Sequence, residues 1–69
     1  MAVVLKSNNR EVTISSNNKD LYHKFKKWLF NYNHYTKFSD KNCYFFKDDF
    51  WISGAITKAN RLGLSVEVQ

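Results

Sequence analysis

The residues of this 69-residue chain that are able to bind an anion are concentrated in one segment. Between residues 17 and 39 a single acidic residue, Asp20, stands against five lysines: Lys19, Lys24, Lys26, Lys27 and Lys37. The whole chain has a formal charge of +5 at pH 7. A local excess of positive charge is expected of a protein that binds an anionic partner. The alternative interpretation is a solvated helix face that keeps a small protein soluble.

A second candidate surface lies nearer the C-terminus. Trp51, Gly54, Lys58 and Arg61 recur at spacings of three, four and three, which places them on one stripe of a helix. An indole on such a stripe can stack on a base or pack into a partner protein, and a glycine lets another backbone approach closely. The structural alternative is that Trp51 covers the end of the sheet and that Gly54 relieves crowding between elements.

These two surfaces together predict a small, non-enzymatic nucleic-acid-binding protein. It is expected to contact the phosphate backbone without strong sequence specificity, with DNA favoured over RNA. The residues expected to make these contacts are Lys19, His23, Lys24, Lys26, Lys27, Tyr35, Lys37, Trp51, Lys58 and Arg61.

A protein partner is the alternative function. In this hypothesis the chain is a phage-encoded module that binds and inhibits or redirects a host or defence enzyme. Exposed aromatic side chains would anchor the complex, and the lysines would steer it toward an acidic surface. Eight asparagines and the absence of proline are compositional hints of an AT-rich, viral genome.

Catalytic and metal-binding chemistry finds little support in the residue types and their spacing. His23 and His34 are eleven residues apart, and neither has a second ligand at the spacing of a zinc site. Asp48 and Asp49 are explained as helix caps. Cys43, the only cysteine, excludes an internal disulfide and is expected to be inert in an apolar strand. We therefore expect no enzymatic activity, no metal and no cofactor.

The lysine-rich segment 17–32 has the pattern of an amphipathic helix. Asn17 is the expected N-cap, with Asp20 three residues later as in a capping box. The outer face is predicted to carry Lys19, His23, Lys26 and Lys27, and the inner face Leu21, Phe25, Trp28, Leu29 and Tyr32.

A second helix is predicted over residues 50–62. Asp48 and Asp49 precede it as natural caps, and Gly63 follows it as a left-handed C-cap. Its inner positions are predicted to be Ile52, Ala55, Ile56 and Ala59.

Alternating apolar residues predict four strands, at residues 2–6, 11–15, 43–47 and 64–68. Asn8 and Asn9 suit a two-residue hairpin turn, because asparagine tolerates a positive φ. Residues 33–42 are expected to form a polar loop. The edge strand of the sheet is expected to be the strand at 2–6 or the one at 64–68.

The order strand, strand, helix, strand, helix, strand predicts an α+β two-layer sandwich. We expect one domain over residues 1–69, with both helices on one face of a four-stranded sheet that is largely antiparallel or mixed. Because no apolar run approaches the roughly 20 residues of a membrane span, we expect a cytoplasmic protein, in the host cell if it is viral.

Residues 50–58, FWISGAITK, followed by Gly63 and a terminal strand, resemble the end of the small N-terminal domain of UvsW-type phage helicases. The hairpin, the first helix and the aromatic strand at Tyr44 follow the same broad order. The resemblance implies that Lys58 and the basic surface around it face DNA. This chain has no ATP-binding motor, so unwinding is excluded. It also departs from the family in having no equivalent of the glycine-bearing aromatic segment between the central strands, which bears on the DNA-binding surface.

Overall fold

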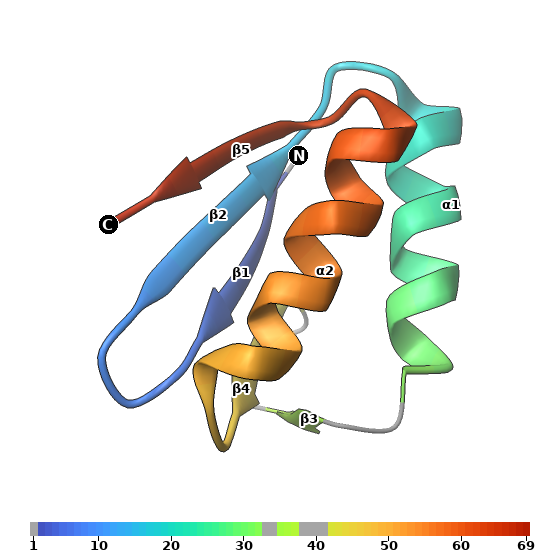
Figure 1. Ribbon diagram of the computed structural model, residues 1–69. Helices are drawn as coiled ribbons and strands as arrows, with labels where there is room; N and C mark the ends of the chain where they lie inside the picture. The colour runs from blue at the N-terminus through green and yellow to red at the C-terminus, as the bar shows by residue number, and fades with distance from the viewer. Residues whose placement is uncertain (1, 33–34, 38–41) are drawn as a thin grey trace.

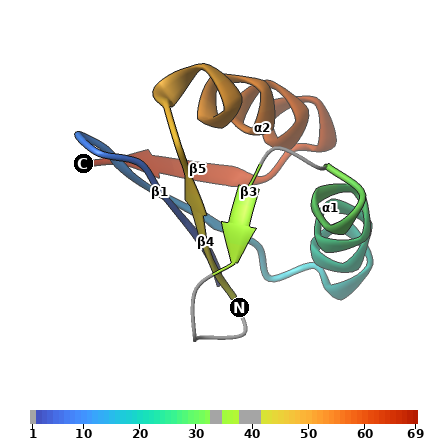
Figure 2. The same cartoon turned by 90° about the horizontal axis from the view of Figure 1, so that it is seen from below.

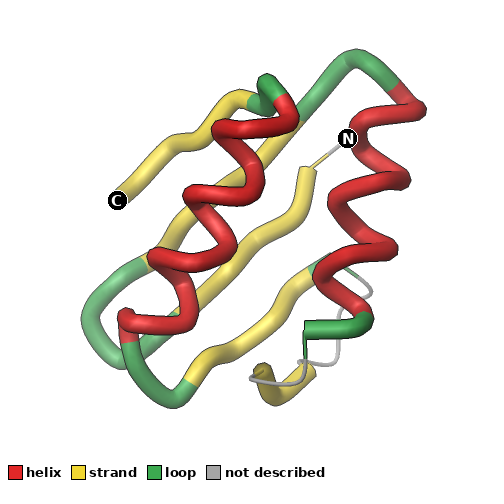
Figure 3. The backbone as a smooth tube through the Cα atoms, turned by 45° about the vertical axis from the view of Figure 1, so that its right-hand side comes forward, coloured by secondary structure: helices red, strands yellow, loops and turns green. Residues whose placement is uncertain are grey.

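Two helices lie side by side on one face of a mixed β-sheet (Figures 1 and 3). The computed structural model describes residues 2–32, 35–37 and 42–69. Its elements follow in the order β1 (Ala2–Lys6), β2 (Glu11–Ser15), α1 (Lys19–Phe30), β3 (Tyr35–Lys37), β4 (Cys43–Phe46), α2 (Asp49–Leu62) and β5 (Ser65–Val68). The predicted α+β class, with both helices on one face, is confirmed (Figure 2).

The sheet has the strand order β3-β4-β1-β2-β5. The central strand β1 pairs antiparallel with β2 and parallel with β4, so the sheet is mixed. The strand β5 pairs antiparallel with β2 and forms one edge, whereas the prediction that β1 could be an edge strand is wrong. All four predicted strands are present, within one residue at each end.

The strand β3 is an addition to the four predicted strands. It pairs antiparallel with β4 and forms the second edge of the sheet. Its three residues fall within the segment 33–42 that was predicted to be a loop, so this prediction is wrong for residues 35–37. A strand of three residues is too short for alternation to reveal it, and the polar residues around it favour a loop.

The alternation of the first two strands decides which of their side chains are buried. Val3 lies opposite Ile14, and Leu5 lies opposite Val12; all four side chains are at most 1% exposed. This hairpin forms one wall of the core, because these four buried side chains share one face of the sheet and point toward the helices.

The turn between β1 and β2 is closed by the Ser7 amide, which donates to the Arg10 carbonyl at 2.8 Å. Asn8 and Asn9 form its tip, but no described residue other than glycine has a positive φ, so the predicted reason for asparagine is wrong. The Ser7 hydroxyl donates to the Asp49 carboxylate, and the Asn8 side-chain amide donates to the Lys47 carbonyl at 3.4 Å. These bonds tie the turn to the start of α2.

The helix α1 begins one residue later than predicted, and its N-cap is Asn18 rather than Asn17. The Asn18 side-chain oxygen accepts hydrogen bonds from the amides of Asp20 and Leu21 at 3.0 and 3.3 Å. The Ser16 hydroxyl accepts from the Asn18 amide at 3.0 Å and so holds the cap residue in place. Because Asp20 is then the second helical residue, the predicted capping box is wrong, although its charge still lies in the favourable first turn.

The helix α2 matches its prediction closely. The Asp48 carboxylate caps it by accepting from the Phe50 amide at 3.1 Å, so the helix begins at Asp49. Gly63 ends it in the left-handed region with φ 83°, as predicted. Of the predicted inner residues, Ile52, Ala55 and Ala59 are fully buried, and Ile56 packs against the core.

The two layers share one hydrophobic core, in which the largest fully buried side chains are Phe25 and Phe46. On α1 the buried residues are Tyr22, Phe25 and Leu29, and Leu21, Trp28 and Tyr32 are partly buried. Tyr22 was not predicted on the inner face, but the residue is only 6% exposed. The inner face of α1 is therefore rotated toward Tyr22 and leaves Trp28 between the helices.

Candidate nucleic-acid interface

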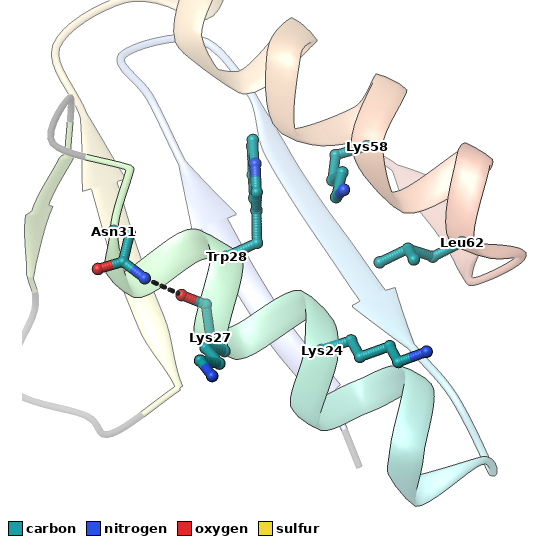
Figure 4. A pocket seen from close by; sticks show the side chains of 6 residues that line it. All are labelled: Lys24, Lys27, Trp28, Asn31, Lys58 and Leu62. Carbon is teal, nitrogen blue, oxygen red and sulfur yellow. Dashed lines mark hydrogen bonds between the residues drawn. The ribbon is translucent and has the colours of Figure 1, made fainter.

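An open groove of about 310 Å³ lies between α1 and α2 (Figure 4). Six side chains line it: Lys24, Lys27, Trp28, Asn31, Lys58 and Leu62. Three of these residues are lysines and none is acidic. The groove is thus a small concave surface with a cationic rim.

The geometry of the two helices brings the three lysines together. Lys24, Lys27 and Asn31 follow one another at spacings of three and four on α1, so they form one stripe. Lys58 and Leu62 are four residues apart on α2 and form the opposing stripe. The helices run in opposite directions, which places the last turn of α2 beside the first half of α1 (Figure 1).

Within the described part of the chain, Lys24, Lys27 and Lys58 form no ion pair and no hydrogen bond through their ammonium groups. Mutual repulsion among three ammonium groups around one groove is unfavourable, and a bound anion would relieve it. The nearest acidic position on the α1 stripe is Asp20, one turn before Lys24 at the start of the helix. The arrangement is suited to a phosphate.

Trp28 gives the groove a rigid floor. Its ring stacks on Tyr32 with 4.6 Å between centroids and lies parallel to Phe25 at 6.0 Å. Tyr32 in turn meets Trp51 of α2 edge-on at 6.2 Å, and Trp51 meets Phe50 at 4.8 Å. This aromatic row spans both helices, so their separation, and with it the groove, is fixed by packing.

Gly54 lies against Tyr32 and is not open to a partner. A Cβ atom at Gly54 would lie 2.6 Å from the Tyr32 hydroxyl oxygen, and that hydroxyl donates to the Trp51 carbonyl at 3.2 Å. The prediction of a bare backbone patch is therefore wrong, and the alternative that Gly54 relieves crowding is confirmed. Trp51 is half-buried against the core rather than fully outward. Burial raises the pKa of the Tyr32 phenol.

Three other predicted contact residues lie on a different stripe of α1. Lys19, His23 and Lys26 are spaced by four and three, and none of them lines the groove. The Lys26 ammonium donates to the Asn42 side-chain oxygen at 2.7 Å and lies 5.6 Å from the centre of the Tyr22 ring. Lys26 is thus half-buried and joins α1 to the start of β4, so its predicted place on the outer face is wrong.

The remaining predicted residues are only partly placed. Arg61 is exposed on α2, one turn after Lys58, and extends the basic surface beyond the groove. Tyr35 and Lys37 have their backbone in β3, and their side chains lie outside the described residues.

Sequence reasoning missed three residues that line the groove. Trp28 was assigned to the core alone, and Asn31 and Leu62 were given no part in a site. Asn31 donates from its side-chain amide to the Lys27 carbonyl at 3.0 Å, which holds it at the end of α1 (Figure 4). The spacing of Asn31 from Lys24 and Lys27 places all three residues on one stripe of α1, and this was the available signal. That stripe lines a groove only because α2 packs antiparallel beside α1.

The described residues contain no group of three His, Cys, Asp or Glu side chains that could hold a metal ion. None of the described helices has both the length and the apolar character needed to cross a membrane. Comparison of the chain with protein-family models, curated proteins and solved structures gave no match. The resemblance to the UvsW-type helicase domain therefore stays a prediction.

Proposed function

We propose that this protein binds nucleic acid and that the groove between α1 and α2 is its phosphate-binding surface. The observation that carries the proposal is the convergence of Lys24, Lys27 and Lys58 from two helices on a groove whose lining contains no acidic side chain. Ammonium groups neutralise phosphates and release the counterions condensed on the nucleic acid, so binding is driven largely by electrostatics.

The number of lysines in the groove sets the expected salt dependence. Three phosphate contacts give a slope of log affinity against log salt of roughly −2 to −3, because each contact contributes about 0.7 to 0.9. Lysines recognise phosphate as point charges, so the affinity should vary little with base sequence.

The proposal is tested by neutralising one lysine on each helix. The variant Lys24→Gln/Lys58→Gln should bind a labelled oligonucleotide more weakly and should reduce the salt slope by about 1.4 to 1.8. Lys19→Gln/Lys47→Gln is the matched control, since it removes the same charge from exposed positions outside the groove. Affinity is measured by fluorescence anisotropy at several salt concentrations, and urea unfolding verifies the fold of each variant.

Two results would contradict this function. Equal losses in the groove variant and the control would show that net charge, and not the groove, governs binding. Absence of binding by the unaltered protein to DNA and RNA at low salt would exclude a nucleic-acid partner altogether.

A protein partner is the second candidate function, and it is supported by two exposed rings. Phe30 is 66% exposed and Phe50 is 71% exposed, although large aromatic side chains are normally buried. Exposed aromatic residues are frequent anchors of protein interfaces, where truncation costs about 2 kcal/mol or more. A partner captured from a nuclease-treated extract should be lost with Phe30→Ala or Phe50→Ala; retention by both variants would exclude these anchors.

A further inference from the structure

We infer that the nucleic acid bound by this protein is single-stranded, with its phosphates on the groove lysines and one unpaired base stacked on Phe50. The inference rests on the proposed function and adds the class of nucleic acid to it. It follows from how far each aromatic ring is exposed, and from where the exposed ring of Phe50 lies relative to the lysines.

Both tryptophans are half-buried and pack against other rings. The indole of Trp28 stacks on Tyr32, with 24° between the planes, and lies nearly parallel to Phe25, at 27°. Trp51 is half-buried and meets Tyr32 and Phe50 edge-on. The base-stacking role predicted for Trp51 therefore passes to Phe50, whose side chain is 71% exposed.

Phe50 lies eight residues before the groove lysine Lys58 on α2. Eight residues turn the helix about 80° beyond two full turns, so Phe50 and Lys58 lie on adjacent sides of α2. At 1.5 Å per residue, Phe50 is about 12 Å from Lys58 along the helix axis. An extended strand running along α2 can thus contact the lysines and, a short way further on, Phe50.

The charges at the two ends of this track differ. Asp48 and Asp49 flank Phe50, where Asp48 caps α2 and Asp49 accepts from the Ser7 hydroxyl. Phosphate is therefore disfavoured at Phe50 and favoured at Lys24, Lys27 and Lys58. A neutral base is the part of a nucleotide that suits the Phe50 end.

The stacking position decides the class of nucleic acid. In a duplex the faces of the bases are covered by their neighbours, and only base edges and phosphates are accessible. A single exposed ring on a helix can stack only on a base that is unpaired. Lysines bind either form, so the preference for single strands must come from Phe50.

The experiment compares Phe50→Ala with Phe30→Ala, since both remove an exposed phenyl ring from an end of a helix. Each variant is titrated with a single-stranded oligonucleotide and with the duplex of the same sequence. Phe50→Ala should weaken single-strand binding by about fivefold or more, the lower end of a lost base–aromatic stack, and leave duplex binding unchanged. Phe30→Ala should change neither affinity. Phe50→Tyr, which keeps an aromatic face, should restore single-strand binding.

The salt slope separates this inference from the proposed function. Phe50→Ala should leave the slope unchanged, because it removes no phosphate contact, whereas Lys24→Gln/Lys58→Gln should reduce it. The stacking inference is overturned if Phe50→Ala binds single strands normally, or if it loses affinity for single strands and duplex equally. If the lysine variant still behaves as expected, the groove remains the proposed phosphate-binding surface. A preference of the unaltered protein for duplex overturns it as well. Failure of the lysine variant to weaken binding overturns the proposed function itself.

Discussion

Adding one methyl group at Gly54 is predicted to destabilise the protein through the Tyr32 side chain. Alanine normally stabilises a helix interior by about 1 kcal/mol relative to glycine. Here the added Cβ would lie 2.6 Å from the Tyr32 hydroxyl oxygen, which is closer than non-bonded carbon and oxygen atoms approach each other. The Tyr32 ring cannot move aside freely, because it packs between Trp28, Trp51 and Phe46 at centroid distances of 4.6 to 6.2 Å.

The magnitude follows from three contributions. Displacing the hydroxyl breaks its hydrogen bond to the Trp51 carbonyl, worth about 1 kcal/mol. Overpacking a well-filled site costs roughly 1 to 3 kcal/mol. After subtracting the gain in helix propensity, the free energy of unfolding of Gly54→Ala should be about 1 to 3 kcal/mol lower than that of the unaltered protein. Each kcal/mol corresponds to a fall in melting temperature of about 4 to 8 °C for a domain of this size.

The assay is a double-mutant cycle with Tyr32→Phe. Without the hydroxyl, the nearest Tyr32 atom to the new Cβ is the ring carbon at 3.6 Å, an ordinary contact. In the Tyr32→Phe background Gly54→Ala should therefore become stabilising, by up to about 1 kcal/mol. Urea unfolding followed by the fluorescence of Trp28 and Trp51 gives all four free energies.

The change of sign between the two backgrounds is the decisive result. If Gly54→Ala has the same effect with and without the Tyr32 hydroxyl, the two residues are not coupled and the close approach of α1 and α2 at this point is refuted. If Gly54→Ala stabilises the unaltered protein, Tyr32 is free to move and the aromatic row does not fix the groove.

Two further predictions concern capping and pH. Asn18→Ala should lower the free energy of unfolding, measured with urea, by about 1 kcal/mol, because it removes the acceptor for the Asp20 and Leu21 amides. Asn17→Ala should change this free energy little. A larger effect of Asn17→Ala than of Asn18→Ala would show that Asn17 is the cap. Burial raises the pKa of Tyr22 and Tyr32 above the ordinary value of 10.0. The folded state then holds these protons more tightly, so their contribution to stability is complete below pH 10.0 and is lost as the pH rises through the raised values. The free energy of unfolding, measured across this pH range, should decline less in the variant Tyr22→Phe/Tyr32→Phe than in the unaltered protein. An equal decline would contradict the assignment of the pH dependence to these two phenols.

Local patterns were sufficient to predict the elements themselves. The hairpin strands Ala2–Lys6 and Glu11–Ser15 were predicted at their observed bounds, and the second helix was predicted to within one residue of its start. Such predictions depend on alternation, helical spacing and caps, and these act between residues close in the chain. The choice of Asn17 over Asn18 as a cap failed because two adjacent asparagines are equivalent by type, and only the Ser16 bond distinguishes them.

The candidate site was predictable only in part. Lys24, Lys27 and Lys58 were on the predicted list. The spacing places Lys24 and Lys26 on different sides of α1, but it does not say which side faces α2. The bond of Lys26 to Asn42, sixteen residues away in the chain, shows that its side faces the start of β4. Trp28 joined the site because the helix is rotated toward Tyr22, and that rotation depends on packing against the sheet.

The sequence alone determined the α+β class, the two helices, their charge and the Gly63 cap, since each depends on local periodicity or on the backbone freedom of a single residue. Only the tertiary structure decided that β1 is central, that β3 exists, and that Gly54 accommodates Tyr32. It also decided which lysines share a groove, because the antiparallel packing of α1 and α2 sets residues more than thirty positions apart beside one another. That packing is fixed by the aromatic row from Phe25 to Phe50, in which the contact of Tyr32 with Trp51 joins residues nineteen positions apart that no local pattern relates.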